Sequence, residues 1–522
     1  MLKKKGVAMA IFFAVILLAS TATFAFNSNP KKIDDASVTN TPMDNFPDEQ
    51  REKFCETGDA KSNAYVTEFK IPTKCTQPLA ITTDDTGMVW FGETNTGKIA
   101  KFDPQSKQFA EFANPGWPEK GRSMFWGIAY FDGDIWYTDD AYNSIWKFST
   151  TDKTYDRTNY PTKEDSLPHH LKIQNSKLIV NDFYESKISI LDIVETGQNG
   201  TYVNIPSPIP GSFTSSFDTD SQGNIWYTNW ILKQGGALVK FDYNEFLKFI
   251  SSPQMTNSTA EQFSDVFELP PTLGTPIGMS VDGNDNLWMA DTSSNSFFKF
   301  DTQDEKFTRY TTSDPDLSVY GNATGMIKSP TSGPYWTQID NGKLIFNEQL
   351  ANAIGVFDIA TESLVEYSVP SKNPNWSDCG SMEECGISQV FGFVSSGDKI
   401  WFTEWVENNI GMVDTAKALP FDLQVSQTDI ALAKGGSAEI QMQITPKTNT
   451  ETTISYKTTS QFNDVSVLIQ TTQVDLTESS IQTIPVSINV SDFALPGVYK
   501  VLLTAKTPDV SVSQFVTVTI TE

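Results

Sequence analysis

Histidine and cysteine are scarce in this 522-residue sequence, which holds only two histidines and four cysteines. The histidines are adjacent, at His169 and His170, so any chemistry that needs an imidazole must use this one position. The sequence has no Cys-x-x-Cys pair, P-loop, dinucleotide-binding glycine motif, nucleophile elbow or His-Glu-x-x-His motif. These absences exclude the commonest signatures of zinc sites, nucleotide binding and serine hydrolysis.

Basic side chains are also few. The 38 Lys and Arg residues face 64 Asp and Glu residues, which gives a formal net charge of −26. So acidic a surface repels nucleic acid and anionic lipid headgroups, and neither is expected as a partner. It suits solubility and the binding of cations.

Long apolar runs are absent except at the N-terminus, where the charged, apolar and small residues follow one another as they do in an export signal. Three lysines at 3–5 precede an apolar run at 7–19, and small residues at 23–25 offer a cleavage site. We expect residues 1–26 to be a signal peptide; the alternative is an uncleaved anchor, because the apolar run approaches bilayer length. The remaining chain is expected to be secreted or held at the cell surface, with no other membrane insertion.

The four cysteines fit an oxidising compartment. Cys55 and Cys75 are near each other in the sequence, and so are Cys379 and Cys385. Two disulfides are therefore expected, although four cysteines allow three pairings.

One pattern recurs seven times: an apolar or aromatic strand ends in an acid or amide, and a short turn leads into a second strand. Side chains alternate with period two in both halves, which indicates strands. The copies are VWFGETNTGKIAKFD (89–103), IWYTDDAYNSIWKFS (135–149), LIVNDFYESKISILD (178–192), IWYTNWILKQGGALVKFD (225–242), LWMADTSSNSFFKFD (287–301), LIFNEQLANAIGVFD (344–358) and IWFTEWVENNIGMVD (400–414). The acid or amide is Glu93, Asp139, Asp182, Asn229, Asp291, Glu348 or Glu404. Successive positions are 43 to 62 residues apart, the length of a four-stranded propeller blade.

The two ends of the repeat region predict that the ring closes. The seventh copy lacks the strand that follows other copies, and a matching strand, VTEFKIP (66–72), precedes the first copy. We expect this N-terminal strand to complete the last blade, which leaves no open sheet edge. A Cys55–Cys75 disulfide would bracket the strand. Small residues such as Gly127 and Gly278 are expected where the innermost strands crowd around the axis.

The repeat stops after Asp414, and the composition changes. Residues 419–522 contain no Cys or Trp, are rich in Thr, Val, Ser and Ile, and alternate in short runs, which predicts an immunoglobulin-like β-sandwich. The expected organisation is all-β: a signal peptide at 1–26, a flexible lead-in at 27–62, a seven-bladed β-propeller at 63–418 and the sandwich at 419–522.

The repeated motif, above all FTEWVENNIG (402–411), resembles that of the virginiamycin B lyase (streptogramin lyase) family of propellers. The resemblance covers roughly residues 64–415. It implies the fold and, for the enzymes, a magnesium ion and a histidine base that open a cyclic depsipeptide ester by elimination. In that family the histidines follow a proline on innermost strands of neighbouring blades, and a glutamate of the FTEW type lies beyond one of them.

This sequence departs from the family pattern. Glu404 matches the family glutamate, but Phe391 occupies the histidine position of the same blade. His169 follows Pro168 on the innermost strand of the third blade, where Asp182 is the acid. A histidine and an acid therefore occur together in one blade, as in the family, but the blade is a different one and the second histidine is missing.

Two interpretations of these residues stay open. In the enzymatic one, His169 or His170 is the base, Glu404 assists, and Asp182, Asp139 and Glu348 hold Mg²⁺ or Ca²⁺, which prefer oxygen ligands. In the structural one, the histidines are ordinary channel residues, and each acid accepts hydrogen bonds from its own turn.

The preferred function is a secreted or surface propeller that binds a small-molecule, peptide or glycan ligand, as a monomer. Trp126, Trp230 and Trp405 are candidates to line the channel mouth. The alternatives are a Mg²⁺-dependent lyase that opens a cyclic ester, and a metal-dependent lactonase-type hydrolase with several acids around one ion.

Overall fold

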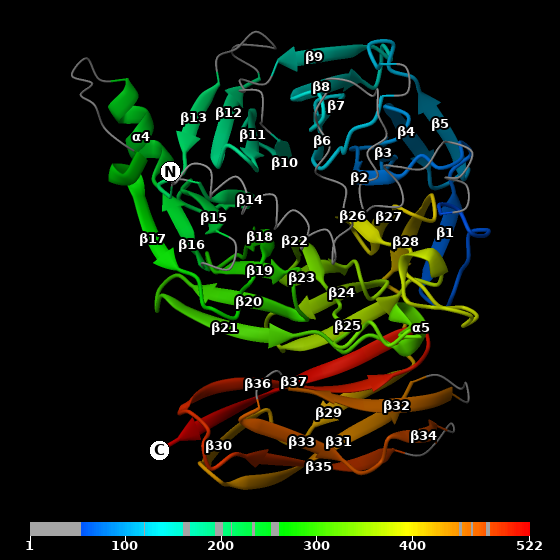
Figure 1. Cartoon of the computed structure of the whole chain (residues 1–522), viewed down its shortest axis with the longest axis vertical. Coiled ribbons are helices and arrows are strands. Elements are labelled where there is room, and N and C mark those ends of the chain that lie inside the picture. The colour runs from blue at the N-terminus through cyan, green and yellow to red at the C-terminus, as the bar shows by residue number, and fades with distance from the viewer. Residues whose placement is uncertain are drawn as a thin grey trace.

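The computed structural model describes residues 54–522 apart from 119–120, 160–166, 194–201, 210, 232–234, 252–259, 448–451, 461–462 and 477–480. The predicted signal peptide and most of the lead-in lie outside the described residues. No helix within the described part of the chain is long and apolar enough to cross a membrane. A ring of small sheets and a second β-rich body beside it make up the molecule (Figure 1).

Seven groups of four antiparallel strands form the ring, and we number them units 1 to 7. Units 1 to 3 are β2 (Pro78–Thr83), β3 (Val89–Glu93), β4 (Lys98–Asp103), β5 (Gln108–Phe112); β6 (Ile128–Phe131), β7 (Asp134–Asp139), β8 (Ser144–Ser149), β9 (Tyr155–Asn159); and β10 (Pro168–Gln174), β11 (Lys177–Asp182), β12 (Lys187–Asp192), β13 (Val203–Pro206). Units 4 and 5 are β14 (Phe213–Thr219), β15 (Ile225–Ile231), β16 (Gly235–Phe241), β17 (Ser264–Glu268); and β18 (Pro276–Val281), β19 (Leu287–Asp291), β20 (Ser296–Asp301), β21 (Lys306–Thr311). Units 6 and 7 are β22 (Pro334–Asp340), β23 (Lys343–Glu348), β24 (Ala353–Asp358), β25 (Ser363–Ser368); and β26 (Val390–Ser396), β27 (Lys399–Glu404), β28 (Asn409–Asp414), β1 (Val66–Lys70).

Helical segments are short and lie between strands. They are α4 (Tyr243–Ile250), η2 (Ala260–Phe263), α5 (Leu317–Tyr320) and η3 (Pro374–Trp376).

The N-terminal strand closes the ring, as the sequence predicts. β1 pairs antiparallel with β28, from Val66 opposite Val413 to Lys70 opposite Asn409. Disulfides join Cys55 to Cys75 and Cys379 to Cys385, and no described cysteine is free. The first of these bonds ties the segment before β1 to the segment that leads into β2.

Tryptophans at the repeated strand position pack between units. Trp90 of unit 1 lies 5.8 Å, centroid to centroid, from Phe148 of unit 2. Trp288 of unit 5 lies 5.4 Å from Phe357 of unit 6. Because each ring is almost completely buried, this packing supplies much of the apolar area that holds neighbouring units together.

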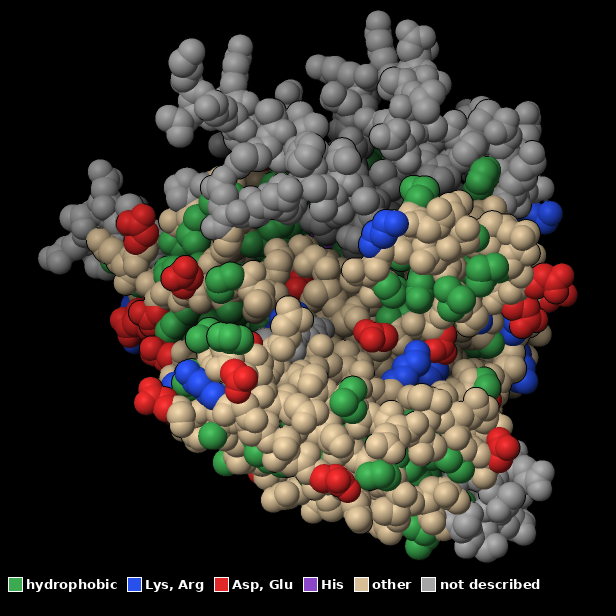
Figure 2. Space-filling view, turned by 60° about the horizontal axis from the view of Figure 1, so that its bottom comes forward, with side chains coloured by type: hydrophobic (Ala, Val, Ile, Leu, Met, Phe, Trp, Pro, Cys, Tyr) green, Lys and Arg blue, Asp and Glu red, His purple; other side chains and the backbone are tan. Residues whose placement is uncertain are grey.

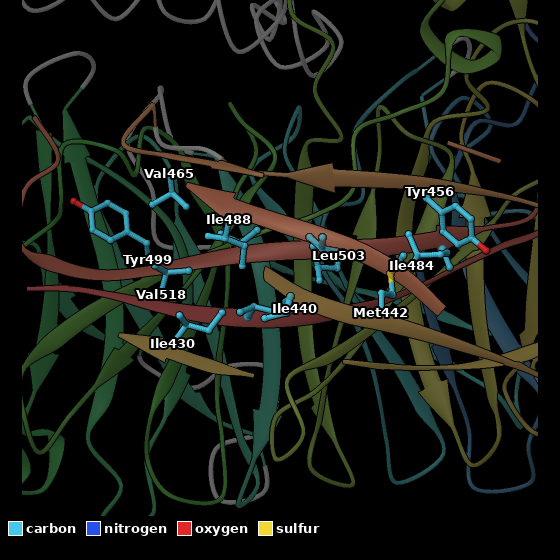
Figure 3. Close-up of a cluster of buried hydrophobic side chains, with 14 of the residues drawn as sticks. Ile430, Ile440, Met442, Tyr456, Val465, Ile484, Ile488, Tyr499, Leu503 and Val518 are labelled. Atoms are coloured by element: carbon cyan, nitrogen blue, oxygen red, sulfur yellow. The ribbon is translucent and has the colours of Figure 1, made fainter. Parts of the chain in front are cut away.

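The C-terminal body consists of two sheets around one apolar core. One sheet is β29 (Phe421–Val425), β31 (Ser437–Pro446), β35 (Gln482–Val490) and β33 (Val465–Ile469). The other holds β30 (Asp429–Ala433), β37 (Val510–Thr521), β36 (Gly497–Lys506), β32 (Thr452–Thr459) and β34 (Gln473–Leu476). Residues from both sheets, among them Ile440, Met442, Ile488 and Leu503, form the core (Figure 3).

The two bodies share a continuous sheet. β25, the outer strand of unit 6, pairs antiparallel with β37, with Val365 opposite Val512. Phe515 of β37 packs in one buried cluster with Phe297 and Phe357 of the ring. The C-terminal body is therefore attached through both a hydrogen-bonded ladder and an apolar contact (Figure 1). Acidic side chains are scattered over the face seen in Figure 2, with few basic ones among them.

Candidate functional site

A repeated bulge places the two histidines. In six units the innermost strand shifts register near its start, after its first residue in five units and after its second in unit 4, and in β10 the shift falls between Pro168 and Leu171. Bulges re-aim the side chains that they contain. His169 and His170 are the two residues inside the bulge of unit 3.

The apolar residues at the first position of the bulge, with Trp126 at the matching place before β6, share one buried cluster. They are Leu79, Trp126, Ile277, Tyr335 and Phe391. The second residue is small in several units, because neighbouring backbones approach closely. A Cβ atom on Gly278 would lie 2.3 Å from the carbonyl oxygen of Tyr335, and one on Gly127 would lie 2.7 Å from that of His169.

His169 belongs to this buried aromatic centre. Its side chain is 4% exposed, and Nδ1 lies 3.3 Å from the carbonyl oxygen of Ser215, to which it donates. The rings of Trp126 and Trp336 lie 4.8 and 5.2 Å from the imidazole, centroid to centroid. Burial lowers the pKa of His169 to about 3, so the imidazole is neutral at physiological pH.

His170 lies one step further along the channel. Its Nδ1 is 3.3 Å from Oγ of Ser216, and its ring centroid is 4.9 Å from that of Trp336. Burial, with the nearby charge of Lys172, lowers the pKa of His170 well below the usual histidine value. Both imidazoles are therefore weak bases, since their protonated forms are disfavoured.

A cavity of about 450 Å³ occupies the channel beyond the aromatic centre. All seven innermost strands, or the residues just before them, contribute to its lining, including Trp126, His170 and Trp336. The charged side chains of the lining are Lys172 and Asp218, which form an ion pair with an N–O distance of 2.9 Å. The cavity thus combines aromatic faces, neutral polar groups and no net charge.

The predicted acids lie at the opposite end of the innermost strands and bond to their own turns. Oδ1 of Asp182 accepts from the backbone N–H groups of Leu167, Tyr184 and Glu185, at 3.1, 3.2 and 2.9 Å. Burial raises the pKa of Asp182 to about 6, against the lowering effect of these bonds.

Asp139 has the same kind of environment in unit 2. Its Oδ2 accepts from the indole N–H of Trp146 at 2.9 Å, and Oδ1 accepts from the backbone N–H of Tyr142 at 3.2 Å. Burial raises the pKa of Asp139 to about 6.

Three units place a second glutamate beside the repeated one, which the sequence reasoning missed. Glu348 lies against Glu366 of β25, and Glu404 lies against Glu68 of β1, each pair joined by a hydrogen bond. Burial, and then the charge of the neighbouring glutamate, raises the pKa of Glu348 and of Glu404 well above the usual value. A proton shared within each pair would relieve the repulsion between two buried carboxylates.

Unit 1 has the same arrangement, with an added cation. Burial raises the pKa of Glu93 to about 8, and Glu111 adds to this effect. The ammonium of Lys98 lies 2.6 Å from Glu111 and 4.0 Å from Glu93.

The signal for these pairs is visible in the sequence once the register is known. The outer strands VTEF, FAEF and LVEY each carry the second glutamate, and a small residue opposite it on the third strand leaves room for contact: Gly411, Ala100 or Gly355. Units 2 and 5 carry Arg157 and Arg309 at this position, opposite the aromatic residues Trp146 and Phe298.

The structure distributes the candidate residues instead of gathering them. His170 lines the channel cavity, Glu348 lines a separate cavity near the C-terminal body, and Asp139, Asp182 and Glu404 line neither. Within the described part of the chain, no three His, Cys, Asp or Glu side chains are grouped closely enough to hold a metal ion.

The tryptophans and the family histidine position are buried. Trp126 lines the channel cavity, whereas Trp230 and Trp405 are 2% and 1% exposed and pack in the aromatic centre, so neither lines an open mouth. Phe391 is fully buried in the same cluster. The position that carries a histidine in the lyase motif is here part of an apolar core.

Comparisons with known proteins agree with the fold. No family model and no curated protein matches the chain. Among solved structures, the chain is similar to virginiamycin B lyase from Staphylococcus aureus, with 20% identity and a TM-score of 0.50 over 68% of this chain and 99% of that one. A streptogramin B lyase structure gives 21% identity and a TM-score of 0.49 over 67% and 99%. The extracellular domain of a putative one-component system from B. thetaiotaomicron gives 12% identity and 0.41 over 85% and 57%. At these identities the similarity concerns the fold alone, and the ring is a β-propeller with a fold related to that of virginiamycin B lyase.

Proposed function

We propose that the protein is an exported, seven-bladed β-propeller that binds an uncharged polar ligand in its channel, with an immunoglobulin-like sandwich fixed to unit 6. The observation that carries the proposal is the cavity of about 450 Å³ at the convergence of all seven units. Its size falls within the range of small-molecule sites, and aromatic faces beside neutral polar groups are the usual composition of such sites. Two disulfides are consistent with export.

The charges on the cavity lining favour an uncharged ligand. Lys172 and Asp218 neutralise each other, and His170 is uncharged, so a charged ligand finds no unpaired partner on the lining. Trp336 offers a flat apolar face, and Thr337 and Ser280 offer hydroxyl groups. Sugars and neutral peptides combine an apolar face with hydrogen-bonding groups, and they match this lining.

The histidines and acids support binding more than elimination chemistry. His169 and His170 are weak bases because burial disfavours their protonated forms. The acids of the repeat bond to their own turns or to a second glutamate, as structural groups do.

Tryptophan fluorescence tests the proposal, because Trp126 and Trp336 line the cavity. The mature chain would be titrated with neutral sugars, short peptides, cyclic esters and lactones. At least one neutral compound should bind saturably, and Trp336→Ala should abolish the binding. Phe493→Ala is the control, since this side chain is 90% exposed on the C-terminal body. Absence of binding by every compound, binding unaffected by Trp336→Ala, or turnover of a cyclic ester would contradict a pure binding role.

A further inference from the structure

The three buried glutamate pairs differ in one neighbour, the first residue of the third strand. In unit 1 this residue is Lys98, directly opposite Glu93, and its ammonium contacts the pair. In unit 7 it is Asn409, whose side-chain N–H donates to Glu404 at 3.1 Å. In unit 6 it is Ala353, opposite Glu348, which offers no donor. The third-strand nitrogen that serves the pair in units 1 and 7 is therefore missing from unit 6, where the backbone N–H and hydroxyl of Ser313 donate to Glu366 only.

A cavity of about 150 Å³ lies at this place in unit 6. Ala353, Glu348 and Glu366 contribute to its lining, and so do Lys506 and Asp509 from the C-terminal body. Glu348 is 1% exposed, and its buried Oε1, like that of Glu93 and of Glu404, receives no hydrogen bond from any described residue. Of these three glutamates, Glu348 is the one that lines this cavity. The cavity is separate from the channel cavity and lies between the propeller and the sandwich.

Acidic side chains outnumber basic ones in the lining, which favours a cation with N–H donors. The acids are Asp314, Asp316, Glu348, Glu366, Glu384 and Asp509, against Lys61, Lys372 and Lys506. A single proton between the buried carboxyls of Glu348 and Glu366 would still leave that pair with one negative charge. Within the described chain neither glutamate has an ion-pair partner, and the nearby ammonium of Lys506 lies 2.6 Å from Asp316 instead. A buried charge without a partner is costly, so a cation that donates to the pair would be held there.

We propose that this cavity binds a primary ammonium group, whose nitrogen takes the place beside Ala353 that the ammonium of Lys98 takes in unit 1. Cavities of this volume hold molecules of about the size of benzene. The group therefore belongs to a small free amine or to a lysyl side chain that enters from the rim. Because residues of both bodies line the cavity, the bound group would also contact both.

Saturation-transfer NMR detects the weak binding that so small a ligand allows. The mature chain would be titrated with methylammonium chloride up to about 200 mM at constant ionic strength, with tetramethylammonium and potassium chloride as controls. We expect transfer to the methyl protons of methylammonium, none to tetramethylammonium, and no competition by potassium. A parallel titration with N-acetyl-lysinamide distinguishes the two sources: stronger transfer identifies a lysyl side chain, and weaker transfer a free amine.

Two variants locate the site. Ala353→Lys introduces the ammonium that unit 1 already has, so transfer should be lost and the melting temperature should not fall. The double variant Glu348→Gln/Glu366→Gln keeps the shape of both side chains but removes the charge of the pair, and it should weaken binding at least about tenfold, as expected for loss of a charged hydrogen-bond partner. Glu439→Gln, on the exposed face of β31, is the matched control and should leave binding unchanged.

The proposal is overturned if the unaltered chain shows no transfer, or if potassium competes equally. It is also overturned if the double variant Glu348→Gln/Glu366→Gln binds methylammonium as the unaltered chain does. This double variant makes the decision even if Ala353→Lys fails to fold.

Discussion

Glu68 on β1 and Glu404 on β27 form a buried, hydrogen-bonded carboxyl pair, although they come from opposite ends of the propeller sequence. Backbone and hydroxyl groups of Ser371 donate to Glu68, at 2.9 Å for the backbone N–H, and so fix it. The strand that closes the ring is thus held by this carboxyl pair as well as by its ladder with β28.

Raising the pH should therefore destabilise the fold. Glu93, Glu348 and Glu404 have pKa values above the ordinary value, so the folded state binds more protons than the unfolded state. Their contribution is complete below the unfolded pKa and is lost as the pH rises through the folded pKa. For Glu93 the window runs from about 4.5 to about 8. We expect the urea midpoint, followed by tryptophan fluorescence, to fall across this window.

The variant Glu404→Gln isolates the contribution of the closing pair. An amide donates to Glu68 without a shared proton, so the fall in stability with pH should become shallower. Glu439→Gln, which is exposed, should leave the slope unchanged. A urea midpoint that stays flat between about pH 5 and 8 in the unaltered chain would contradict the assignment of shared protons.

Removing the Cys55–Cys75 disulfide should loosen the closure of the ring. The bond spans 20 residues that include β1, and cross-links of this span stabilise a fold by about 3 kcal/mol. The double Ser variant should unfold at lower urea and be cut by protease near β1. The Cys379–Cys385 bond spans 6 residues, so its double Ser variant is a control with a smaller loss, about 2 kcal/mol. Equal losses would show that β1 needs no tether.

Asp182→Ala should destabilise the fold without any effect of metal ions. The change leaves three backbone N–H groups without their acceptor, at a cost of about 1–3 kcal/mol. Asp182→Asn keeps Oδ1 and should lose less. Calorimetric titration with Mg²⁺ and Ca²⁺ is the measurement, with the unaltered chain and Asp182→Ala compared after EDTA treatment. Stoichiometric binding that is lost in Asp182→Ala would favour the metal-dependent enzymes.

Phe515→Ala tests the contact between the two bodies. The ring is 1% exposed and lies 5.1 Å from Tyr310 of unit 5, so its loss should cost about 3–5 kcal/mol. Scanning calorimetry should show one transition for the unaltered chain and two separated ones for the variant. Phe493→Ala should change little, because that side chain is exposed. Two transitions in the unaltered chain would show that the bodies unfold independently.

The repeat made the ring predictable because each copy carries the same local information. The alternation of side chains predicted the strands, and the unmatched strand at 66–72 predicted the closure of the ring. The short separation of the cysteines in the sequence suggested how they pair. Gly127 and Gly278 were expected to be small, and neighbouring backbones do approach them closely.

The site was harder to predict because it depends on contacts between strands. The sequence showed the repeated acid, but the partners Glu68 and Glu366 come from outer strands two positions away in the sheet. Burial of His169 depends on aromatic side chains from units 2 and 6, which meet only when the ring closes. The same convergence turned Trp230 and Trp405 from expected mouth residues into core residues.

The pairing of β25 with β37 has a consequence for solubility. Without residues 419–522 the propeller would present β25 as a bare strand edge, and its buried Leu364 would lie next to unpaired backbone groups. Such edges recruit strands from other molecules, which leads to aggregation. The C-terminal body thus covers this edge of unit 6, whereas the outer strands of the other units end their sheets without such a cover. Shortening the chain at the end of the repeat would expose both the edge and the apolar cluster that contains Phe515.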